Sequence, residues 1–188
     1  MLSRHRRRAA QAAVETALIL PFLTLLTLGA ADLGRAFYLH LEITGAARAG
    51  MRDGIQGNGH DIGDATRSEP NTAIPNSAAA WGATGPGGSY DCNPGTPGHT
   101  CGDPNGCPAG SFVSGQIACF AVRTCTITTG ACSSFGGWQS RPPGGGAAPT
   151  AIVVRTVYKF TPVTPLIAQF GSNGSFYLQE ESYGLELY

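Results

Sequence analysis

The first 31 residues constrain the fold of this chain more than any other stretch. Arginines at positions 4 and 6–8 precede a run from Ala9 to Ala31 that is apolar apart from Glu15 and a few uncharged polar residues. A run of this length can cross a bilayer as a helix, and the positive charge before it favours a cytoplasmic N-terminus. The sequence therefore predicts a basic leader over 1–10 and a single-pass membrane anchor that ends near residue 31, with the C-terminal region exported.

Glu15 is the exception within this apolar run. A carboxylate near the centre of a bilayer costs about 2.5–3.5 kcal/mol, and acidic residues inside membrane segments are usually functional for that reason. We therefore single out Glu15 as a candidate functional residue.

The helical pattern continues beyond the anchor, which predicts one helix over 11–53. Its first half is apolar on all sides and its second half is amphipathic, with charged residues between the apolar positions. Pro21 removes one backbone donor and is expected to kink the first half, and Gly54 begins the stop. The apolar stripe of the second half consists of Leu33, Phe37, Leu41, Thr44, Met51 and Ile55, and it is broadened by Leu39, Ile43, Ala46 and Ala47.

Residues 54–111 are rich in Gly, Pro and Cys, and Gly and Pro make up almost half of the stretch from Gly82 to Gly110. Proline and glycine at this density exclude a long helix or a regular central strand. We expect a loop region that disulfides staple, because a chain with so little core gains much from cross-links.

Residues 112–188 are predicted to form a small antiparallel β region. The clearest strand is Ala151 to Thr161, where apolar side chains alternate with Arg155 and Lys159. Residues 112–127 also favour strand, and a last strand or hairpin follows the Asn173-Gly174 turn. The fold class is therefore α+β, with the long N-terminal helix packed on the sheet and the stapled region inserted between them.

All six cysteines follow the anchor, as expected for disulfides in an oxidising compartment. Fifteen pairings of six cysteines are possible. Cys119 and Cys125 cannot pair if they share one extended strand, because they would lie about 20 Å apart. The favoured pattern joins Cys125 to Cys132 across a hairpin turn, Cys101 to Cys107 around the turn between them, and Cys92 to Cys119.

Several spaced motifs of the N-terminal 53 residues resemble the TadE-like family, the minor pilins or pseudopilins of the tight-adherence (Flp-type) pilus system. They are RRRAAQAAVE at 6–15, LILPF at 18–22, DLGRAF at 32–37 and AARAG at 46–50. The tail, with AIVV at 151–154 and TPVTPL at 161–166, resembles the late strand and Pro-rich turn of that family. The cysteine- and glycine-rich middle has no counterpart in the resemblance.

The resemblance implies cleavage by a prepilin peptidase between Ala10 and Gln11, which would make Glu15 the fifth mature residue. Ala10 stands where glycine is commoner, and Thr16 follows the glutamate where an aromatic residue is frequent. The carboxylate of Glu15 could then pair with the amino terminus of a neighbouring subunit, so that correct stacking of helices satisfies a group that lipid cannot.

The function expected from this resemblance is that of a minor pilin in pilus assembly or adhesion. Its expected partners are the membrane, other pilin subunits, the prepilin peptidase and the pilus assembly platform proteins. The alternative is a secreted or membrane-anchored, disulfide-stabilised binding protein with a conventional signal peptide, cut after Ala31.

No catalytic set, metal site or cofactor motif stands out in the sequence, and we expect no enzyme. The cysteines contain no C-x-x-C pair, and His99 is interpreted as a loop histidine. The stretch from Asp103 to Gly106 favours a type I turn over a calcium loop. The chain has no net charge and its one arginine cluster, at 4 and 6–8, lies in the leader, so no nucleic-acid partner is expected.

Overall fold

A computed structural model describes residues 2–55, 62–70, 74–75, 78–82, 102–103, 105–138 and 150–185 of the chain. The chain divides into two compact units. The first consists of Met1–Phe37 and Thr161–Ser175, and the second of Tyr38–Phe160 and Phe176–Tyr188. Each unit is described by itself.

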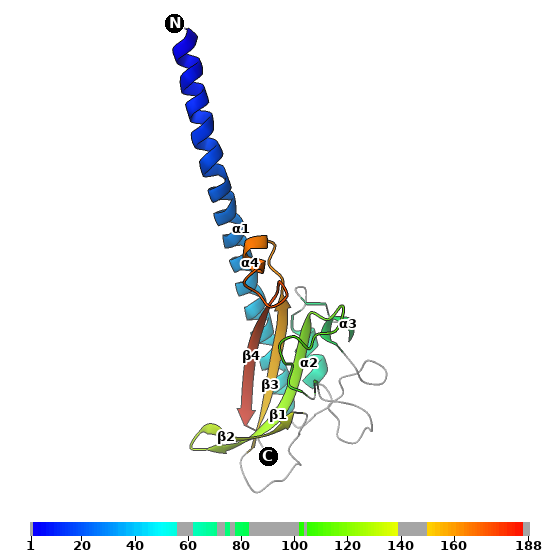
Figure 1. Cartoon of the computed structure of the whole chain (residues 1–188). Helices are drawn as coiled ribbons and strands as arrows, with labels where there is room; N and C mark the ends of the chain where they lie inside the picture. The colour runs from blue at the N-terminus through cyan, green and yellow to red at the C-terminus, as the bar shows by residue number, and fades with distance from the viewer. Residues whose placement is uncertain are drawn as a thin grey trace. The chain divides into compact units, whose positions relative to one another are not determined.

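A single helix, α1 (Leu2–Ile55), covers the N-terminal region of the chain (Figure 1). It is continuous through Pro21 and past Ala31, which confirms the prediction of one long helix. It also includes most of the basic leader and ends within two residues of the predicted position. The kink expected at Pro21 stays a prediction.

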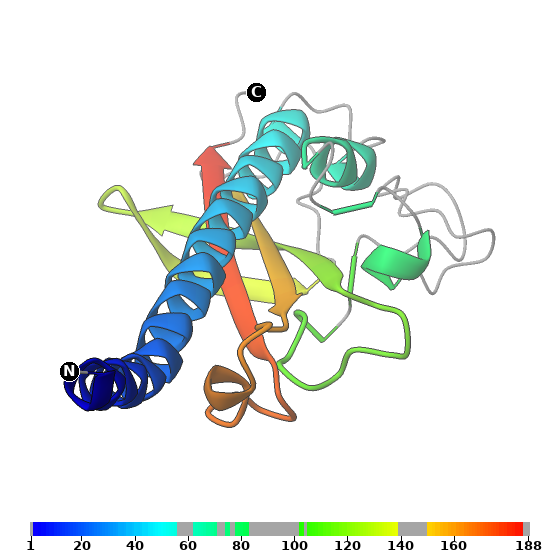
Figure 2. The same ribbon diagram turned by 90° about the horizontal axis from the view of Figure 1, so that it is seen from above.

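The second unit contains an antiparallel sheet in the order β2-β1-β3-β4. The strands are β1 (Ala118–Thr128), β2 (Ala131–Trp138), β3 (Thr150–Phe160) and β4 (Phe176–Leu185). Seen from above, the C-terminal half of α1 crosses one face of this sheet (Figure 2). The predicted α+β class, a long helix on a small antiparallel sheet, is therefore confirmed.

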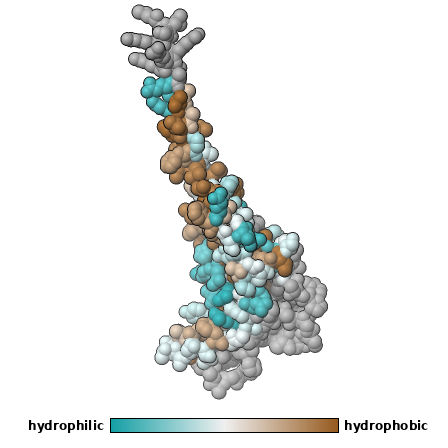
Figure 3. Space-filling view, viewed as in Figure 1, coloured by the Kyte–Doolittle hydropathy of each residue, from teal (hydrophilic) through white to brown (hydrophobic). Residues whose placement is uncertain are grey.

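The first unit combines the N-terminal part of α1 with a short helix, α4 (Pro165–Ala168), and its flanking turns. Within this unit α1 exposes a band of apolar side chains (Figure 3). The segment Thr161–Ser175 connects β3 to β4 and contains the Pro-rich motif noted in the sequence.

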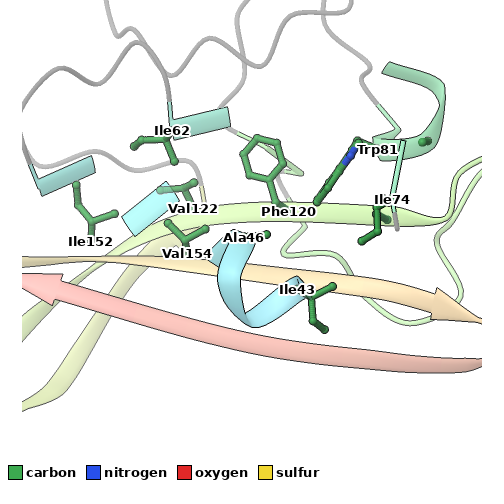
Figure 4. Packing of buried hydrophobic residues seen from close by; sticks show 11 residues of the cluster. Ile43, Ala46, Ile62, Ile74, Trp81, Phe120, Val122, Ile152 and Val154 are labelled. Carbon is green, nitrogen blue, oxygen red and sulfur yellow. The ribbon is translucent and has the colours of Figure 1, made fainter. Parts of the chain in front are cut away.

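The main core of the second unit lies between α1 and the sheet (Figure 4). Alternate residues of β1 and β3 face α1, as the strand pattern of the sequence predicts. On α1 the buried side chains are those that broadened the apolar stripe, namely Leu39, Ile43, Ala46 and Ala47, whereas Leu41 is exposed. The core cluster comprises Ile43, Ala46, Ile62, Ile74, Ala80, Trp81, Ala118, Phe120, Val122, Ile152 and Val154.

The helix approaches the sheet closely because small residues line the contact. A Cβ built on Gly54 would lie 3.0 Å from the Cδ1 atom of Ile152, and one on Gly184 of β4 would overlap Met51. The buried hydroxyl of Thr156 donates a hydrogen bond of 2.9 Å to the carbonyl of Ile43. This bond joins β3 directly to the backbone of α1.

Two short helices, α2 (Ile62–Ser68) and α3 (Ala78–Trp81), lie in the region for which the sequence predicts loops. Ile62 of α2 and Trp81 of α3 are both buried in the main core. Trp81 packs edge-on against Phe120, with ring centroids 6.3 Å apart. These helices are too short for a clear period in the sequence, and they form because their apolar side chains complete the core.

The opposite face of the sheet is covered by the loop from Cys107 to Phe112, with Trp138 packed beside it. Arg155 donates a hydrogen bond to the carbonyl of Gly106 and stacks over the Trp138 ring at 4.5 Å from its centroid. Arg155 also forms an ion pair with Glu181 of β4. Buried hydrophobic residues therefore lie on both faces of β1 and β3.

The four cysteines that the structure describes form two disulfides, Cys107–Cys119 and Cys125–Cys132. The second pair and the exclusion of a Cys119–Cys125 bond are confirmed. The predicted pairs Cys101–Cys107 and Cys92–Cys119 are wrong, because Cys107 reaches β1 when its loop folds back over the sheet. Cys92 and Cys101 themselves lie outside the described residues.

Candidate assembly interface

The N-terminal part of α1 presents large apolar side chains that nothing in the first unit covers. They begin at Val14 and end at Phe37, and the most exposed include Leu18 and Leu33, at 74% and 73%. A soluble protein rarely exposes so large an apolar surface. By length and composition this helix is able to cross a membrane. The apolar run of the sequence ends at Ala31, directly before Asp32.

Polar side chains in this segment are largely satisfied within the helix. Thr16, Thr24 and Thr27 donate their hydroxyls to helix carbonyls three or four residues earlier, at 2.7–2.9 Å. Such bonds remove the cost of an unpaired hydroxyl in lipid. The threonines are therefore compatible with a membrane-spanning segment.

Glu15 is exposed, and its carboxylate accepts a hydrogen bond of 3.3 Å from the side-chain amide of Gln11. This donor is neutral. Among the side chains that the structure describes, which begin at Gln11, no ion pair reaches Glu15. The structure brings Gln11 and Glu15 together on one helix face. The structure does not test cleavage after Ala10, which stays a prediction.

Asp32 is a residue of structural importance to which the sequence analysis assigned no role. Its side chain is buried, at 3% exposure, and accepts hydrogen bonds from the backbone N–H groups of Val163 at 2.9 Å and Thr164 at 2.8 Å. Arg35 lies one turn further along α1, 3.5 Å from the same carboxylate. The hydrogen bond from Val163 is the main cause that lowers the pKa of Asp32 below its ordinary value. Hydrogen bonds from Thr164 and the positive charge of Arg35 lower this pKa further.

A signal for Asp32 was present in the sequence. It is the first charge after the apolar run and begins the DLGRAF motif. Its partners are backbone groups more than 130 positions later, and backbone donors leave no trace in the choice of residue. Sequence reasoning could identify the carboxylate but not the segment that it binds.

Asp103 begins the stretch for which the sequence favours a turn over a calcium loop, and the structure places it in a turn. Its side chain accepts hydrogen bonds of 3.0 Å from the N–H groups of Asn105 and Cys107, while Gly106 donates to its carbonyl. Asp103 also lies within 4.8 Å of the sulfurs of Cys107 and Cys119. These two sulfurs are bonded to each other, so they are not available as thiolate ligands.

A small cavity of about 120 Å³ lies beside this turn. Its lining includes the side chains of Asp103 and Gln116. Each accepts a hydrogen bond from a backbone N–H group of the neighbouring loop, Asp103 from Cys107 and Gln116 from Val113. A nucleophile with an adjacent base is not found among its described lining residues. The cavity therefore gives no basis for a catalytic assignment.

These features define an α+β protein in which an exposed apolar helix, able by length and composition to cross a membrane, continues into a disulfide-containing region. A family model described as TadE-like protein matches residues 10–52. All of these residues lie in α1, and they include Glu15 and the small residues at the contact with the sheet. The match is confined to α1, so it shows that this helix is similar to TadE-like proteins, as the motifs predict, and that family is associated with the Tad pilus. Neither the curated proteins nor the solved structures gave a match.

Proposed function

We propose that this protein is a minor pilin, or pseudopilin, of a tight-adherence pilus and acts through helix packing rather than catalysis. The observation that carries the proposal is the exposed apolar surface of α1, with one carboxylate that lacks a cationic partner among the described residues. In a bundle of subunits this surface would pack against neighbouring helices, and Glu15 would meet a neighbouring amino terminus.

The proposal places the basic leader in the cytoplasm and the disulfide-containing region outside the membrane. The arginines before the apolar run favour this orientation, and the disulfides require an oxidising compartment. Its partners would be other pilin subunits, the prepilin peptidase and the assembly platform proteins. In an assembled pilus the same helix would leave the membrane and pack among its neighbours.

The alternative, a signal peptide cut after Ala31, fits the helix less well. Such a cut would make Asp32 the first residue of the mature chain, although Asp32 lies within α1 and its buried carboxylate holds Val163 and Thr164. The first turn of a helix frays readily. After such a cut, the hydrogen bonds of Asp32 to Val163 and Thr164 would depend on a turn that no preceding residues hold in place. An uncut or prepilin-processed helix keeps the turn intact.

The N-terminus of the membrane-extracted protein, measured by intact mass and terminal sequencing in its native host, tests the proposal. A chain that starts at Gln11 supports the pilin, whereas a start at Asp32 contradicts it in favour of a secreted protein. A start at Met1 would contradict processing and leave a plain anchor.

Two variants sharpen this test because each enlarges the small residue before one of the two cuts. Ala10→Leu should block formation of the chain that starts at Gln11. Ala31→Leu should leave that chain unaffected. The opposite pattern would identify a signal peptidase as the processing enzyme.

A further inference from the structure

The segment Thr161–Ser175, which we name the α4 loop, is a closed structure within the first unit. Its ends meet where the hydroxyls of Thr161 and Ser175 lie 3.2 Å apart. Successive turns inside it are held by backbone bonds, including those from Ala168 to Thr164 and from Gly171 to Ala168, both of 3.1 Å. Compact loops with closed ends hold a fixed surface and are frequently functional.

The α4 loop is attached to α1 at the point where the apolar run ends. Asp32 accepts hydrogen bonds from Val163 and Thr164, and Gly29, inside the run, leaves room for Ile167 nearby. At 1.5 Å per residue, Gly29 lies only about 3 Å before the end of the run at Ala31. If residues 12–31 cross the bilayer, the α4 loop is fixed at the depth of the headgroup and acyl-chain boundary.

The surface of the α4 loop suits that depth. No Asp, Glu, Lys, Arg or His occurs between Thr161 and Ser175. Its Thr164 is buried and its uncharged Gln169, Ser172 and Asn173 are exposed, while Val163, Leu166 and Phe170 are 65%, 48% and 81% exposed. A segment with outward apolar side chains and no charge suits the interfacial region of a bilayer, where polar side chains can still reach the headgroups.

We propose that the α4 loop is a second membrane contact, in which Val163, Leu166 and Phe170 enter the outer leaflet of the bilayer that α1 spans. The occupant of this surface is phospholipid at the boundary between headgroups and acyl chains, because the loop is continuous with the lipid-exposed surface of α1. This inference rests on the membrane insertion of α1 that the proposed function includes.

The test uses the full chain reconstituted in vesicles of phosphatidylcholine and phosphatidylglycerol. A small share of the lipid carries a photoactivatable diazirine near the ester end of one acyl chain, and adducts are mapped by peptide mass spectrometry after illumination. We expect adducts on α1 and on the peptide that contains Leu166 and Phe170. Peptides with Val113 and Phe135, which are 58% and 49% exposed in the second unit, serve as controls and should carry background only.

The variants Leu166→Asp and Phe170→Asp change exposed positions, so the fold is expected to tolerate them. Each should lower adducts on the α4 loop to the level of the Val113 control and leave those on α1 unchanged. Amide exchange at Val163 and Thr164 checks that the loop is still bound to Asp32 in each variant.

Two outcomes separate this inference from the proposed function. Adducts on α1 without adducts on the α4 loop would overturn the second contact and leave membrane insertion intact. A chain without adducts on either would overturn both. A photoreactive amino acid at position 170, illuminated in native membranes, gives the third arm of the test: cross-links to another protein in place of lipid would identify the α4 loop as a subunit contact and overturn the inference.

Discussion

Glu15 and Asp32 are both carboxylates on α1, and their surroundings differ in a way that separates their roles. Glu15 is exposed, and among the described side chains its partner is the neutral amide of Gln11. Asp32 is buried and accepts two backbone hydrogen bonds. A satisfied carboxylate stabilises its own chain, whereas an exposed one in an apolar segment is available to a partner. We therefore expect substitutions at the two positions to affect different properties.

Glu15→Ala should reduce assembly without reducing membrane insertion. The substitution removes a charge that lipid disfavours, so insertion should be as good or better, while the pairing with a neighbouring amino terminus is lost. Co-purification with partner pilins measures assembly, and alkaline extraction of membranes measures insertion. Normal assembly of this variant would mean that the pairing role assigned to Glu15 is wrong.

Two controls separate the charge of Glu15 from its shape. Glu15→Gln keeps the size and the hydrogen bonding of the side chain, so it should fail to assemble like the alanine variant if charge pairing matters. Thr16→Val changes the adjacent residue, whose hydroxyl is bonded to the carbonyl of Ala12, and should assemble normally.

Asp32→Ala should release the α4 loop from α1. The amides of Val163 and Thr164 would lose a charged acceptor, and we expect their hydrogen exchange to become at least about tenfold faster. Arg35→Ala is the matched control, because this side chain is half exposed and its ion pair is long at 3.5 Å. It should change exchange at Val163 much less. Equal effects of the two substitutions would argue against a direct role of the Asp32 carboxylate.

The protection that Asp32 provides should also depend on pH. Its pKa is lowered in the folded protein, first by the Val163 N–H, so its contribution is complete above the unfolded pKa of about 3.9. The contribution is lost as the pH falls through the lower folded value. The difference in exchange between the wild type and Asp32→Ala should therefore be large at neutral pH and disappear in strong acid. A difference independent of pH would show that the carboxylate charge is not its source.

At the scale of elements, the second half of α1 is built for close contact. Ala46 and Ala47 are fully buried, and a Cβ built on Gly50 would overlap the hydroxyl of Thr66 in α2. The same position would lie 3.3 Å from the carbonyl of Ile62. The AARAG motif of the family resemblance thus has a physical reason in this chain, because its small residues let α2 and the sheet approach the helix backbone.

Gly50→Ala and Gly34→Ala form a matched pair on this helix. Alanine favours a helix over glycine by about 0.5–1 kcal/mol, and Gly34 has no atom within 4 Å of a built Cβ, so Gly34→Ala should stabilise the protein. Gly50→Ala should destabilise it by about 1–3 kcal/mol because Thr66 must move. Thermal unfolding of the full chain in detergent measures both effects. A stabilised Gly50→Ala variant would contradict the close packing of α1 on α2.

The sequence was sufficient to predict the elements in which a short burial period repeats many times. The apolar run, its amphipathic continuation and the alternation from Ala151 to Thr161 predict α1 and β3 because each repeats one burial pattern many times. It was also sufficient for the bond of Cys125 to Cys132, since a hairpin joins neighbours in the chain.

Long-range contacts were the part that the sequence could not predict. Cys107 pairs with Cys119 because its loop folds over the outer face of the sheet, and no local pattern encodes that return. The same holds for Asp32, whose partners are backbone amides in a distant loop. Trp81 and Ile62 enter the core from helices too short to show a period.

At the scale of the whole molecule, the two described disulfides staple different parts of the second unit. Cys107–Cys119 fixes a loop over buried Val157 and Ala121 on the outer face of the sheet. Cys125–Cys132 spans only the hairpin between β1 and β2, whose turn is exposed. The first staple therefore supports tertiary packing, and the second supports one local pairing.

The double variants Cys107→Ala/Cys119→Ala and Cys125→Ala/Cys132→Ala should consequently differ in stability. Chain entropy alone predicts losses of about 2.8 and about 2.4 kcal/mol for sequence separations of 12 and 7. The first variant also uncovers the outer face of the sheet, so its loss should be clearly the larger when the midpoints of denaturant unfolding are compared. Equal midpoints would mean that the loop stays in place without its disulfide. Peptide mapping of the unreduced wild type is the accompanying control, since six free thiols would contradict both the staples and the export of this region.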